Sequence, residues 1–407
     1  APVPAAAGEI SCDVAVIGGG YTGLSAALHL AQAGLDVVVL EAHRVGFGAS
    51  GRNGGQVSPG QRVEQDALED MLGPEHARAL WDLSLESVAL TKALAERHAP
   101  EAAFVPGLIH ADHRERIVRP HHAYAERLRT EYGYDKTRPL SREEIREMVG
   151  SDAYHGGVRD AGAGHLHPLN YALGLARAAQ AAGARIFERS RVDWVTETDP
   201  VRIGAGAARI RARHLLWAAN GYLGDMDRRI AAQVMPINNF IVATEPLGSL
   251  ADALIPGREA VADSKFVVNY FRLSADGRML FGGGESYGYR FPADIAAKAR
   301  RPMLEIYPQL AEAKIDYAWG GTLAITRTRM PHFEWLAPNI LTAGGYSGHG
   351  VALATLGGKL AAEAIQGQAG RFDLMASVPT PRFPGGIALR WPLLVLAMVW
   401  FSLRDRL

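Results

Sequence analysis

The spacing of apolar residues changes twice near the N-terminus, and this change predicts a β–α–β unit. Residues 12–17 form a largely apolar run, small and apolar residues recur at helical spacing over 21–33, and residues 37–40 form a second apolar run. Short continuous runs are typical of strands buried in a parallel sheet, whereas recurrence at three and four is typical of a helix. We therefore expect two parallel strands joined by a helix.

Glycines occupy the turn between the first predicted strand and the helix. Gly18 allows a tight turn, Gly20 lets the backbone approach a pyrophosphate, and Gly23 lets the helix pack closely on the sheet. The free N–H groups at the start of such a helix favour phosphates. Glu41 follows the second strand, where an acid accepts hydrogen bonds from a ribose. This pattern predicts a dinucleotide site; an ordinary turn without a ligand is the alternative.

Periodicity further along the chain predicts a second set of elements. A strand is expected at 103–109, and a turn-rich segment is expected at 157–166. Recurrence at three and four predicts helices over 62–99, 113–131, 168–182, 293–310 and 351–365. Short apolar runs predict strands over 186–195, 201–210, 215–219 and 340–343.

Three later segments alternate between apolar and polar residues. They predict strands over 234–244, 266–273 and 278–283, with a hairpin signal at Asp276-Gly277 between the last two. Alternation is typical of antiparallel strands that are covered on one face. The chain has 407 residues, enough for two domains, and we place this antiparallel sheet in the second domain.

Charge and cysteine usage narrow the function. Lys plus Arg and Asp plus Glu number 43 each, so no net charge favours nucleic acid or an acidic membrane as a partner. The one cysteine, Cys12, excludes an internal disulfide and fits a cytoplasmic location. The apolar run at 391–401 is shorter than the ~20 residues that a membrane span needs. We expect it to pack on the protein; a peripheral membrane contact is the alternative.

Two more glycine-rich segments, at 46–56 and 345–350, contain too many glycines for a stable helix or strand. Such loops let backbone N–H groups converge on a ligand. Together with the turn at 18–23 and the HLHPLN run at 165–170, they occur in the order found in a known family. The chain resembles the FAD-dependent amino acid and amine oxidases related to D-amino acid oxidase and sarcosine oxidase, from about Asp13 to the C-terminus.

The resemblance implies an α/β fold with two domains. A Rossmann-like FAD-binding domain is expected to be discontinuous, and the second, α+β, domain is expected to be a substrate domain built on an antiparallel sheet. The FAD-binding domain is assigned to 1–85, 154–228 and 326–380, the substrate domain to 86–153 and 229–325, and an apolar C-terminal segment to 381–407.

The resemblance also implies that FAD binds non-covalently in an extended form, with its adenine end near Glu41 and its flavin between the domains. The strand at Val192 is expected to meet the adenine, and the turn at Gly348 is expected beneath the pyrimidine edge of the flavin. The residues expected to hold the cofactor are Gly18, Gly20, Tyr21, Thr22, Gly23, Glu41, Ala42, Gly48, Ala49, Ser50, Arg52, Asn53, Gly54, Gly55, Gln56, Val192, Ala219, Asn220, Gly345, Tyr346, Gly348, His349 and Gly350.

Two departures from the family pattern matter. No cysteine lies in the C-terminal part, which excludes the cysteinyl flavin link of some sarcosine oxidases; a histidyl link through His43 is disfavoured. Those oxidases also bind a substrate α-carboxylate with a lysine two residues after the Ser-Gly-His-Gly turn, where this chain has Ala352. The loss of that ammonium removes a charge-assisted bond of roughly 1.5–3 kcal/mol. An amine that carries its charge elsewhere is therefore expected as the substrate.

The implied reaction is oxidation of a C–N bond by hydride transfer to flavin N5. The imine product hydrolyses to an aldehyde or keto compound, and O2 is reduced to H2O2. A γ-glutamylated or other non-α-amino-acid amine is the expected substrate. A dehydrogenase that uses a quinone or carrier acceptor is one alternative, and a non-catalytic flavin-binding protein is an alternative of another class.

Four residues are candidates for the catalytic site. Tyr270 and Arg272 share one face of a predicted strand, where the tyrosine would orient the amine and the arginine would bind a distal carboxylate. Arg52 would lie against the flavin, and His349 would stabilise negative charge if protonated or face the substrate. The alternatives are that Tyr270 packs in the core and that Arg272 lies on the surface. For Arg52 the alternative is a phosphate contact or a surface position, and for His349 it is a capping or packing role.

Other residues are weaker candidates. A cation at Lys265 or Arg327 would favour dioxygen reduction if it lay near the flavin, and Trp319 would form an aromatic wall. The histidines at 121, 122, 165 and 167 lack the carboxylates of a metal site, so no metal is predicted.

Overall fold

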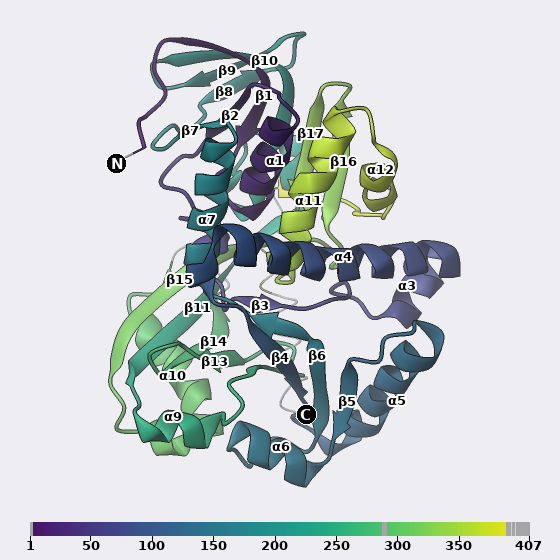
Figure 1. The fold of residues 1–407 in the computed structure, drawn as a ribbon, viewed down its shortest axis with the longest axis vertical. Coiled ribbons are helices and arrows are strands. Elements are labelled where there is room, and N and C mark those ends of the chain that lie inside the picture. The colour runs from purple at the N-terminus through teal and green to yellow at the C-terminus, as the bar shows by residue number, and fades with distance from the viewer. Residues whose placement is uncertain (1–2, 287–290, 388–391, 393–394, 396–407) are drawn as a thin grey trace.

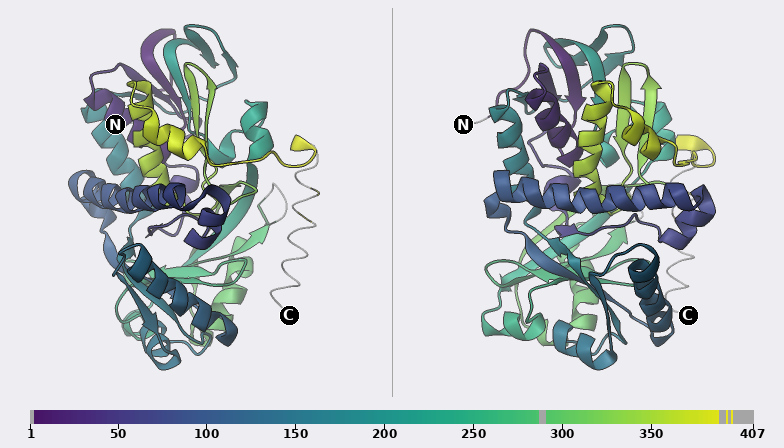
Figure 2. Two further views of the ribbon diagram at one scale, coloured as in Figure 1. Left: turned by 90° about the vertical axis from the view of Figure 1, so that its right-hand side faces the viewer. Right: turned by 45° about the vertical axis from the view of Figure 1, so that its right-hand side comes forward.

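The computed structural model describes residues 3–286, 291–387, 392 and 395. Its strands form two sheets, one in each half of the molecule, and the long helix α4 (Pro74–His98) crosses between the halves (Figures 1 and 2). This arrangement confirms the α/β fold class with two sheets.

The first sheet has eight strands, and its main path runs in the order β16-β17-β10-β1-β2-β7. Neighbouring strands from β17 to β7 are parallel, while β16 pairs antiparallel with β17 and β9 pairs antiparallel with β10 and β8. The strands are β1 Glu9–Ile17, β2 Val37–Leu40, β7 Arg185–Phe187, β8 Trp194–Thr196, β9 Val201–Ala205, β10 Ala208–Trp217, β16 His332–Ala337 and β17 Ile340–Gly344.

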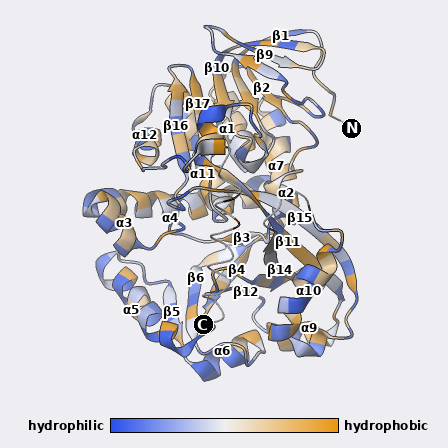
Figure 3. Ribbon diagram, turned by 180° about the vertical axis from the view of Figure 1, so that it is seen from behind, coloured by the Kyte–Doolittle hydropathy of each residue, from blue (hydrophilic) through white to orange (hydrophobic). Residues whose placement is uncertain are grey.

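Helices cover the first sheet and bury its apolar strands. Helices α1 (Tyr21–Gln32) and α11 (Gly350–Ile365) lie side by side, with α7 (Pro168–Ala181) beside α1 and α12 (Gly370–Ala376) beside β16 (Figure 1). All four residues of β2 are buried, as its continuous apolar run predicts. Hydrophobic colour is concentrated on these strands, whereas the outer helices α5 (Glu115–Glu131) and α6 (Arg142–Val149) are largely hydrophilic (Figure 3).

The second sheet has nine strands, and its main path runs in the order β15-β11-β14-β13-β12-β4-β6-β3, with β5 paired to β6. All pairs are antiparallel except the parallel pair of β4 and β12. The strands are β3 Gln56–Val57, β4 Val105–Ala111, β5 Thr137–Leu140, β6 Gly157–His165, β11 Met235–Pro246, β12 Ala260–Asp263, β13 Tyr270–Leu273, β14 Arg278–Ser286 and β15 Ile315–Ile325.

Shorter helices complete the fold. Helix α10 packs against β11 and β14 of the second sheet. The short helix α2 lies within the glycine-rich segment that follows β2. The remaining helices are α2 Ala49–Arg52, α3 Gln65–Leu72, α8 Arg228–Gln233, α9 Ser249–Leu254 and α10 Ile295–Ile306, with single 3₁₀ turns at Pro100–Ala102, Asn220–Tyr222 and Pro308–Leu310.

The glycine-rich loop belongs to both halves. Its first part forms α2, which packs against α7 and against β15 of the second sheet, and its end, β3, pairs with β6, so that Gln56 lies opposite His165. The segments 56–57 and 157–165 are thus strands of the second sheet. The domain boundaries proposed from the sequence stay a prediction. They assign these two segments to the FAD-binding domain, although the segments pair within the second sheet.

Several predicted elements differ from the structure. The segment 157–166 was predicted to be turn-rich, but it forms β6, because a Cβ at Gly157 or Gly164 would lie within 2.4 Å of a carbonyl oxygen of β4. The predicted helix 62–99 is two helices, since Gly73 has φ +85° and Pro74 begins α4. The predicted strand 186–195 is interrupted around Arg189, which has φ +51°. Of 266–273, only β13 is a strand.

No helix within the described residues is long and apolar enough to cross a membrane. Most of the apolar run at 391–401 lies outside the described residues, so its predicted packing remains a prediction.

Candidate active site

The turn between β1 and α1 brings backbone segments into very close contact. Gly18 has φ +117°, and a Cβ on it would lie 2.6 Å from the carbonyl oxygen of Ala218 at the end of β10. A Cβ on Gly23 would lie 2.0 Å from the carbonyl oxygen of Gly18. Side chains at these positions would therefore push the helix from the sheet, which is the packing that the glycine pattern predicts.

Glu41 is fixed beside this turn. One carboxylate oxygen accepts a hydrogen bond from the Gly19 N–H at 2.8 Å, and the other accepts one from the His43 N–H at 2.8 Å. Its carbonyl oxygen accepts a hydrogen bond from the Ser190 N–H at 2.8 Å, which brings the segment of Val192 to the same edge of the sheet. The acid, the glycine turn and the segment of Val192 thus lie together, although Val192 lies between β7 and β8 and not in the predicted strand.

The loop after α2 is closed by the side chain of Asn53. Its amide nitrogen donates to the carbonyl oxygens of Ala49 and Ser50, both at 2.9 Å, and its amide oxygen accepts from the Gly55 N–H at 2.7 Å. Gly55 has φ +81°, and a Cβ there would lie 1.9 Å from the carbonyl oxygen of Leu166. The loop therefore holds one shape, with its backbone facing the space between the sheets.

Arg272 takes a place that differs from the prediction. The side chain is buried, and its guanidinium donates to the carbonyl oxygens of Gly54 at 2.6 Å and of Leu166 and Leu273 at 3.3 Å. Burial lowers the pKa of Arg272 to about 10. A guanidinium that is occupied by backbone carbonyls beneath the loop is not placed to bind a substrate carboxylate. Strand alternation predicted its face correctly, but not the competing acceptors.

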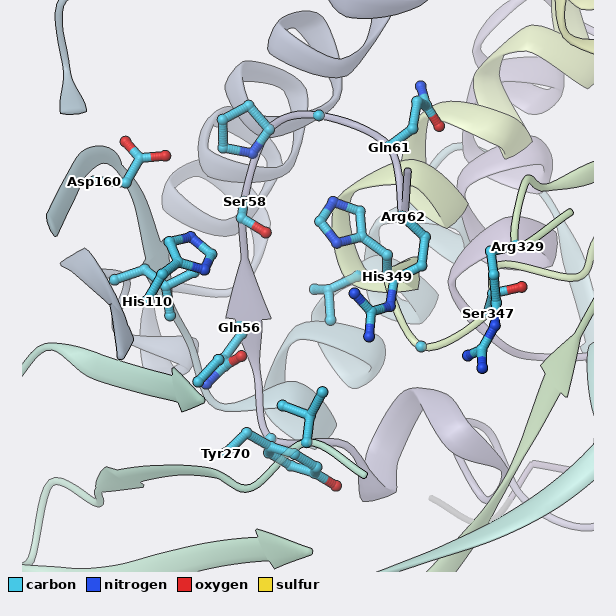
Figure 4. A pocket seen from close by; sticks show the side chains of 18 of the residues that line it. Gln56, Ser58, Gln61, Arg62, His110, Asp160, Tyr270, Arg329, Ser347 and His349 are labelled. Atoms are coloured by element: carbon cyan, nitrogen blue, oxygen red, sulfur yellow. The ribbon is translucent and has the colours of Figure 1, made fainter. Parts of the chain in front are cut away.

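A cavity of about 390 Å³ lies between the loop, the start of α11 and the second sheet (Figure 4). The cavity is lined by nine of the predicted cofactor and catalytic residues, which come from the glycine loop, from the turn before α11 and from the second sheet. These residues are Ala49, Arg52, Asn53, Gly54, Gly55, Gln56, Tyr270, Gly348 and His349.

Tyr270 lies on the wall formed by the second sheet. Its hydroxyl donates to the amide oxygen of Asn239 on β11, and its ring packs against Gly54 and Gly282, where a Cβ would lie 2.8 Å and 2.1 Å from the ring. Glycine on both sides lets the ring lie flat between the loop and the sheet. Tyr270 and Asn239 are thus a fixed polar pair in the cavity.

His349 precedes α11 and has a buried Nε2 without a hydrogen-bond partner. Burial lowers its pKa to about 4, and the positive charge of Arg62 adds to this effect, so the ring is neutral near pH 7. The protonated form considered from the sequence is therefore disfavoured. The first turn of α11 has no side-chain cap, and its N–H groups begin at the edge of the cavity.

Arg52 lines the cavity, but its guanidinium is held by the protein. Nε donates to the Phe47 carbonyl oxygen at 2.5 Å, Nη1 donates to the Gly320 carbonyl oxygen at 3.1 Å, and the group stacks on the Phe47 ring at 4.5 Å. The indole N–H of Trp319 donates to the Arg52 carbonyl oxygen at 3.0 Å. Lys265 and Arg327 lie outside the cavity lining, and Arg327 donates to the carbonyl oxygen of Arg382.

Several predicted cofactor residues contribute backbone rather than side chain. The hydroxyl of Tyr21 donates to the Pro168 carbonyl oxygen at 3.0 Å, and the hydroxyls of Thr22 and Tyr346 are hydrogen-bonded at 2.7 Å in the core. The side chain of Asn220 accepts from the Gly345 N–H at 2.9 Å, away from the main cavity. Ala352, the position of the family lysine, is buried in α11.

A group of titratable side chains in the cavity was not predicted from the sequence. His110 and His121 face each other with ring centroids 6.0 Å apart, and Nδ1 of His121 lies 3.0 Å from the fully buried carboxylate of Asp112. Burial lowers the pKa of His110 to about 3. A signal existed, because His110 and Asp112 alternate at the end of a predicted strand, where functional side chains gather.

Asp160 and Asp263 are two further acids of the lining that sequence reasoning missed. Burial raises the pKa of Asp263 to about 6, although Asn269 donates to both of its oxygens, at 2.9 Å from the backbone and 2.7 Å from the side chain. Asp160 is buried on β6 within the segment predicted as turns. Because that segment was not recognised as a strand, its acid had no predicted face.

These features fit FAD. The bare backbone at Gly18 and Gly23, the fixed Glu41, and the uncapped start of α11 are the parts that hold an extended dinucleotide and a flavin. His349 lines the same cavity, and its buried Nε2 has no partner within the described part of the chain.

The chain matches the family model described as DAO, FAD dependent oxidoreductase, over residues 13–364. It is 44% identical over 404 residues to the probable oxidoreductase OrdL of Rhizobium meliloti (strain 1021), covering 99% of this chain and 94% of that protein. It is 41% identical over 401 residues to the gamma-glutamylputrescine oxidoreductase of Escherichia coli (strain K12), covering 98% and 94%.

Solved structures show the same fold. Glycine oxidase from Geobacillus kaustophilus superposes with a TM-score of 0.76 at 22% identity, covering 92% of this chain and 100% of that chain. L-proline dehydrogenase from P. horikoshii superposes with a TM-score of 0.70 at 21% identity, covering 90% and 94%. With the family model spanning most of its length, the chain belongs to the DAO family of FAD-dependent oxidoreductases.

Proposed function

We propose that this protein oxidises the C–N bond of a γ-glutamylated amine, with O2 as the electron acceptor and H2O2 as a product. The observation that carries the proposal is the cavity between the glycine loop, the start of α11 and the Tyr270–Asn239 pair. The relationship to gamma-glutamylputrescine oxidoreductase, at 41% identity, supports the choice of substrate.

The residues that would hold the cofactor follow from the geometry. Gly18, Gly20 and the start of α1 would hold the pyrophosphate, and Glu41 would accept hydrogen bonds from the ribose. The loop from Asn53 to Gln56 and the turn at Gly348 would hold the flavin. When bound, FAD supplies the acceptor for a hydride from the carbon beside the amine nitrogen.

The start of α11 provides electrostatic stabilisation. Its uncapped N–H groups carry partial positive charge toward the cavity, so they favour negative charge that develops there. His349 is neutral near pH 7 and contributes a hydrogen bond rather than a charge. This arrangement does not depend on a protonated side chain.

The Tyr270–Asn239 pair would orient the amine. The tyrosine hydroxyl is engaged by the Asn239 amide oxygen, which fixes its direction, and its oxygen keeps lone pairs for a donor from the substrate. The buried surroundings favour the neutral amine over its ammonium form, since burial disfavours charge. A neutral nitrogen with its lone pair free is the form that can be oxidised.

A substrate panel on the purified protein tests the proposal. We expect γ-glutamylputrescine to bleach the flavin absorbance without oxygen and to release peroxide with oxygen, while glycine and sarcosine react more slowly. Bleaching without peroxide would indicate a dehydrogenase with another acceptor. No bleaching by any amine or amino acid would contradict the proposed activity and favour a non-catalytic flavin protein.

A further inference from the structure

One part of the cavity is lined by aromatic and polar side chains that the proposed flavin chemistry does not use. We call it the aromatic arm and define it by Trp81 of α4, Tyr124 of α5, and Tyr134, Thr137 and Asp160 near β5 and β6. Figure 4 shows Asp160 on the side of the cavity opposite Ser347 and Arg329. Asp160 therefore lies across the cavity from the turn that contains Ser347.

The carboxylate of Asp160 is held by one oxygen only. Oδ1 accepts hydrogen bonds from the Tyr134 hydroxyl at 2.6 Å, from the Gly162 N–H at 2.8 Å and from the Ala163 N–H at 3.3 Å. Within the described part of the chain, no donor pairs with Oδ2, and no Arg, Lys or His forms an ion pair with the group. One oxygen is thus fixed while the other is available in the cavity.

Asp263, another acid of the cavity lining, has no carboxylate oxygen without a donor. Both oxygens of Asp263 accept hydrogen bonds from Asn269, so its demand is met within the protein. Asp160 is equally buried, at 4% exposed against 5%, yet half of its carboxylate has no donor. Since a buried carboxylate is costly without a partner, Asp160 is arranged for a cationic partner that comes from outside the chain.

The surroundings of Asp160 favour an organic ammonium. The indole N–H of Trp81 and the hydroxyl of Thr137 are buried and have no partner, although both residues line the same arm. The rings of Trp81 and Tyr134 meet edge to face with centroids 5.3 Å apart. Aromatic rings beside a carboxylate favour an ammonium group as its partner.

Strand pairing limits the length of the ligand. His165 lies opposite Gln56 of the glycine loop and opposite Val105 of β4, and Asp160 lies opposite Leu108, three positions (108 minus 105) along β4, which corresponds to roughly 10 Å. In an extended γ-glutamyl derivative of a four-carbon diamine, ten bonds, or roughly 12 Å, separate the terminal amine from the α-ammonium, so the molecule is long enough for this span. The free diamine, at roughly 6 Å, is too short.

We propose that the Asp160 carboxylate binds an alkylammonium group of the substrate remote from the amine that is oxidised. On a γ-glutamyl amine this group is the α-ammonium of the glutamyl end. The inference rests on the proposed function, because the reacting amine is placed beside the glycine loop and Tyr270.

The test compares substrates that differ only at the remote ammonium. γ-Glutamylputrescine, N-glutarylputrescine, which lacks the α-ammonium, and spermidine, whose second ammonium lies on a longer polyamine, are oxidised by the wild type and by Asp160→Asn. We expect kcat/KM for γ-glutamylputrescine to fall about 10- to 100-fold in the variant, with N-glutarylputrescine changed less than about 3-fold. A spermidine preference that depends on Asp160 would assign the arm to polyamines.

Glu312→Gln is the matched control. Glu312 carries the same charge but is exposed and lies outside the cavity lining, so its replacement is expected to change kcat/KM for every substrate by less than about 3-fold. If Asp160→Asn lowers kcat/KM equally for all substrates, the role of Asp160 is structural and the inference is wrong. It is also wrong if the wild type does not distinguish the glutamyl from the glutaryl compound.

A binding measurement separates this inference from the proposed function. γ-Glutamylbutylamide keeps the α-ammonium but lacks the terminal amine that is proposed to be oxidised, and its affinity under anaerobic conditions is measured by calorimetry against that of glutarylbutylamide. We expect the wild type to favour the glutamyl compound about 10-fold or more and Asp160→Asn to lose this preference. That result supports the arm even if no amine is oxidised. Oxidation without any such preference supports the activity and overturns the arm.

Discussion

The glycine turn of the first sheet and the aromatic arm of the second sheet are built in opposite ways. The turn excludes side chains: backbone meets backbone, and a Cβ on Gly23 would lie 2.0 Å from a carbonyl oxygen. The arm is made of side chains that come from α4, α5 and two strands, and two of its polar atoms have no partner. The first region is closed by contacts of the backbone with itself, whereas the second keeps buried polar atoms that no partner in the described part of the chain meets.

This difference predicts how each region responds to substitution. Backbone contacts leave no room for adjustment, so a change in the turn should affect folding and cofactor binding together. Side chains around a cavity have space on one side, so changes there should affect binding with little loss of stability. The following experiments sharpen this contrast, from the largest expected effect to the smallest.

Gly23→Val is expected to have the largest effect. Its Cβ would overlap the Gly18 carbonyl oxygen and force α1 from β1, with a loss of ~3 kcal/mol or more in the free energy of unfolding and loss of bound flavin. The flavin-to-protein absorbance ratio and urea unfolding measure both. Gly370→Ala is the control, since a Cβ there meets nothing within 4 Å. A flavin-loaded Gly23→Val protein of normal stability would contradict the close-packing account.

Arg272→Met tests the buried guanidinium beneath the loop. Its removal leaves the carbonyl oxygens of Gly54 and Leu166 without that donor, and we expect a loss of about 2–3 kcal/mol in the free energy of unfolding and weaker flavin binding. Arg202→Met, at an exposed position of β9, should be neutral. If Arg272→Met instead raises only KM for a γ-glutamyl substrate, the original carboxylate-binding interpretation is restored.

His332, at the start of β16, allows the stability of the part that contains the first sheet to be tested by changing the pH. Burial lowers its pKa to about 4, below the unfolded value of about 6.5, so the unfolded chain binds more protons between these values. Stability is therefore fully present above about pH 6.5 and is lost as pH falls toward 4. Urea unfolding gives the loss in the free energy of unfolding between pH 7 and pH 5. We expect this loss to be about 1–2 kcal/mol smaller in His332→Asn than in the wild type. An unchanged difference would show that His332 is not involved.

Tyr270→Phe is expected to have the smallest effect on stability. It removes the hydroxyl from the cavity but keeps the ring that packs between Gly54 and Gly282. We expect kcat/KM for the amine to fall about 5- to 10-fold, with the free energy of unfolding changed by less than ~1 kcal/mol. A large loss of stability without a change in kcat/KM would assign the hydroxyl to the core.

The same contrast explains what could be predicted from the sequence. The glycine turn at 18–23 and the strand at 37–40 are confirmed, because each depends on residues close in sequence, while the ribose-binding role of Glu41 stays a prediction. Asp160 was missed since Gly157, Gly162 and Gly164 suggested turns, although in β6 glycine allows close approach to neighbouring strands. Arg272 was placed on the correct face, but the carbonyl oxygens that hold it come from residues 54 and 166, which no local pattern reveals.

The pairing of β3 with β6 has a consequence for substrate entry. The loop that faces the cavity is itself an edge strand of the lower half, with Gln56 and Val57 bonded to His165 and Gly164. A hinge motion that separated the two halves would break the pairing of β3 with β6 or would separate the end of the loop from α2. Any motion that admits a substrate is therefore expected to keep the end of the loop paired with β6.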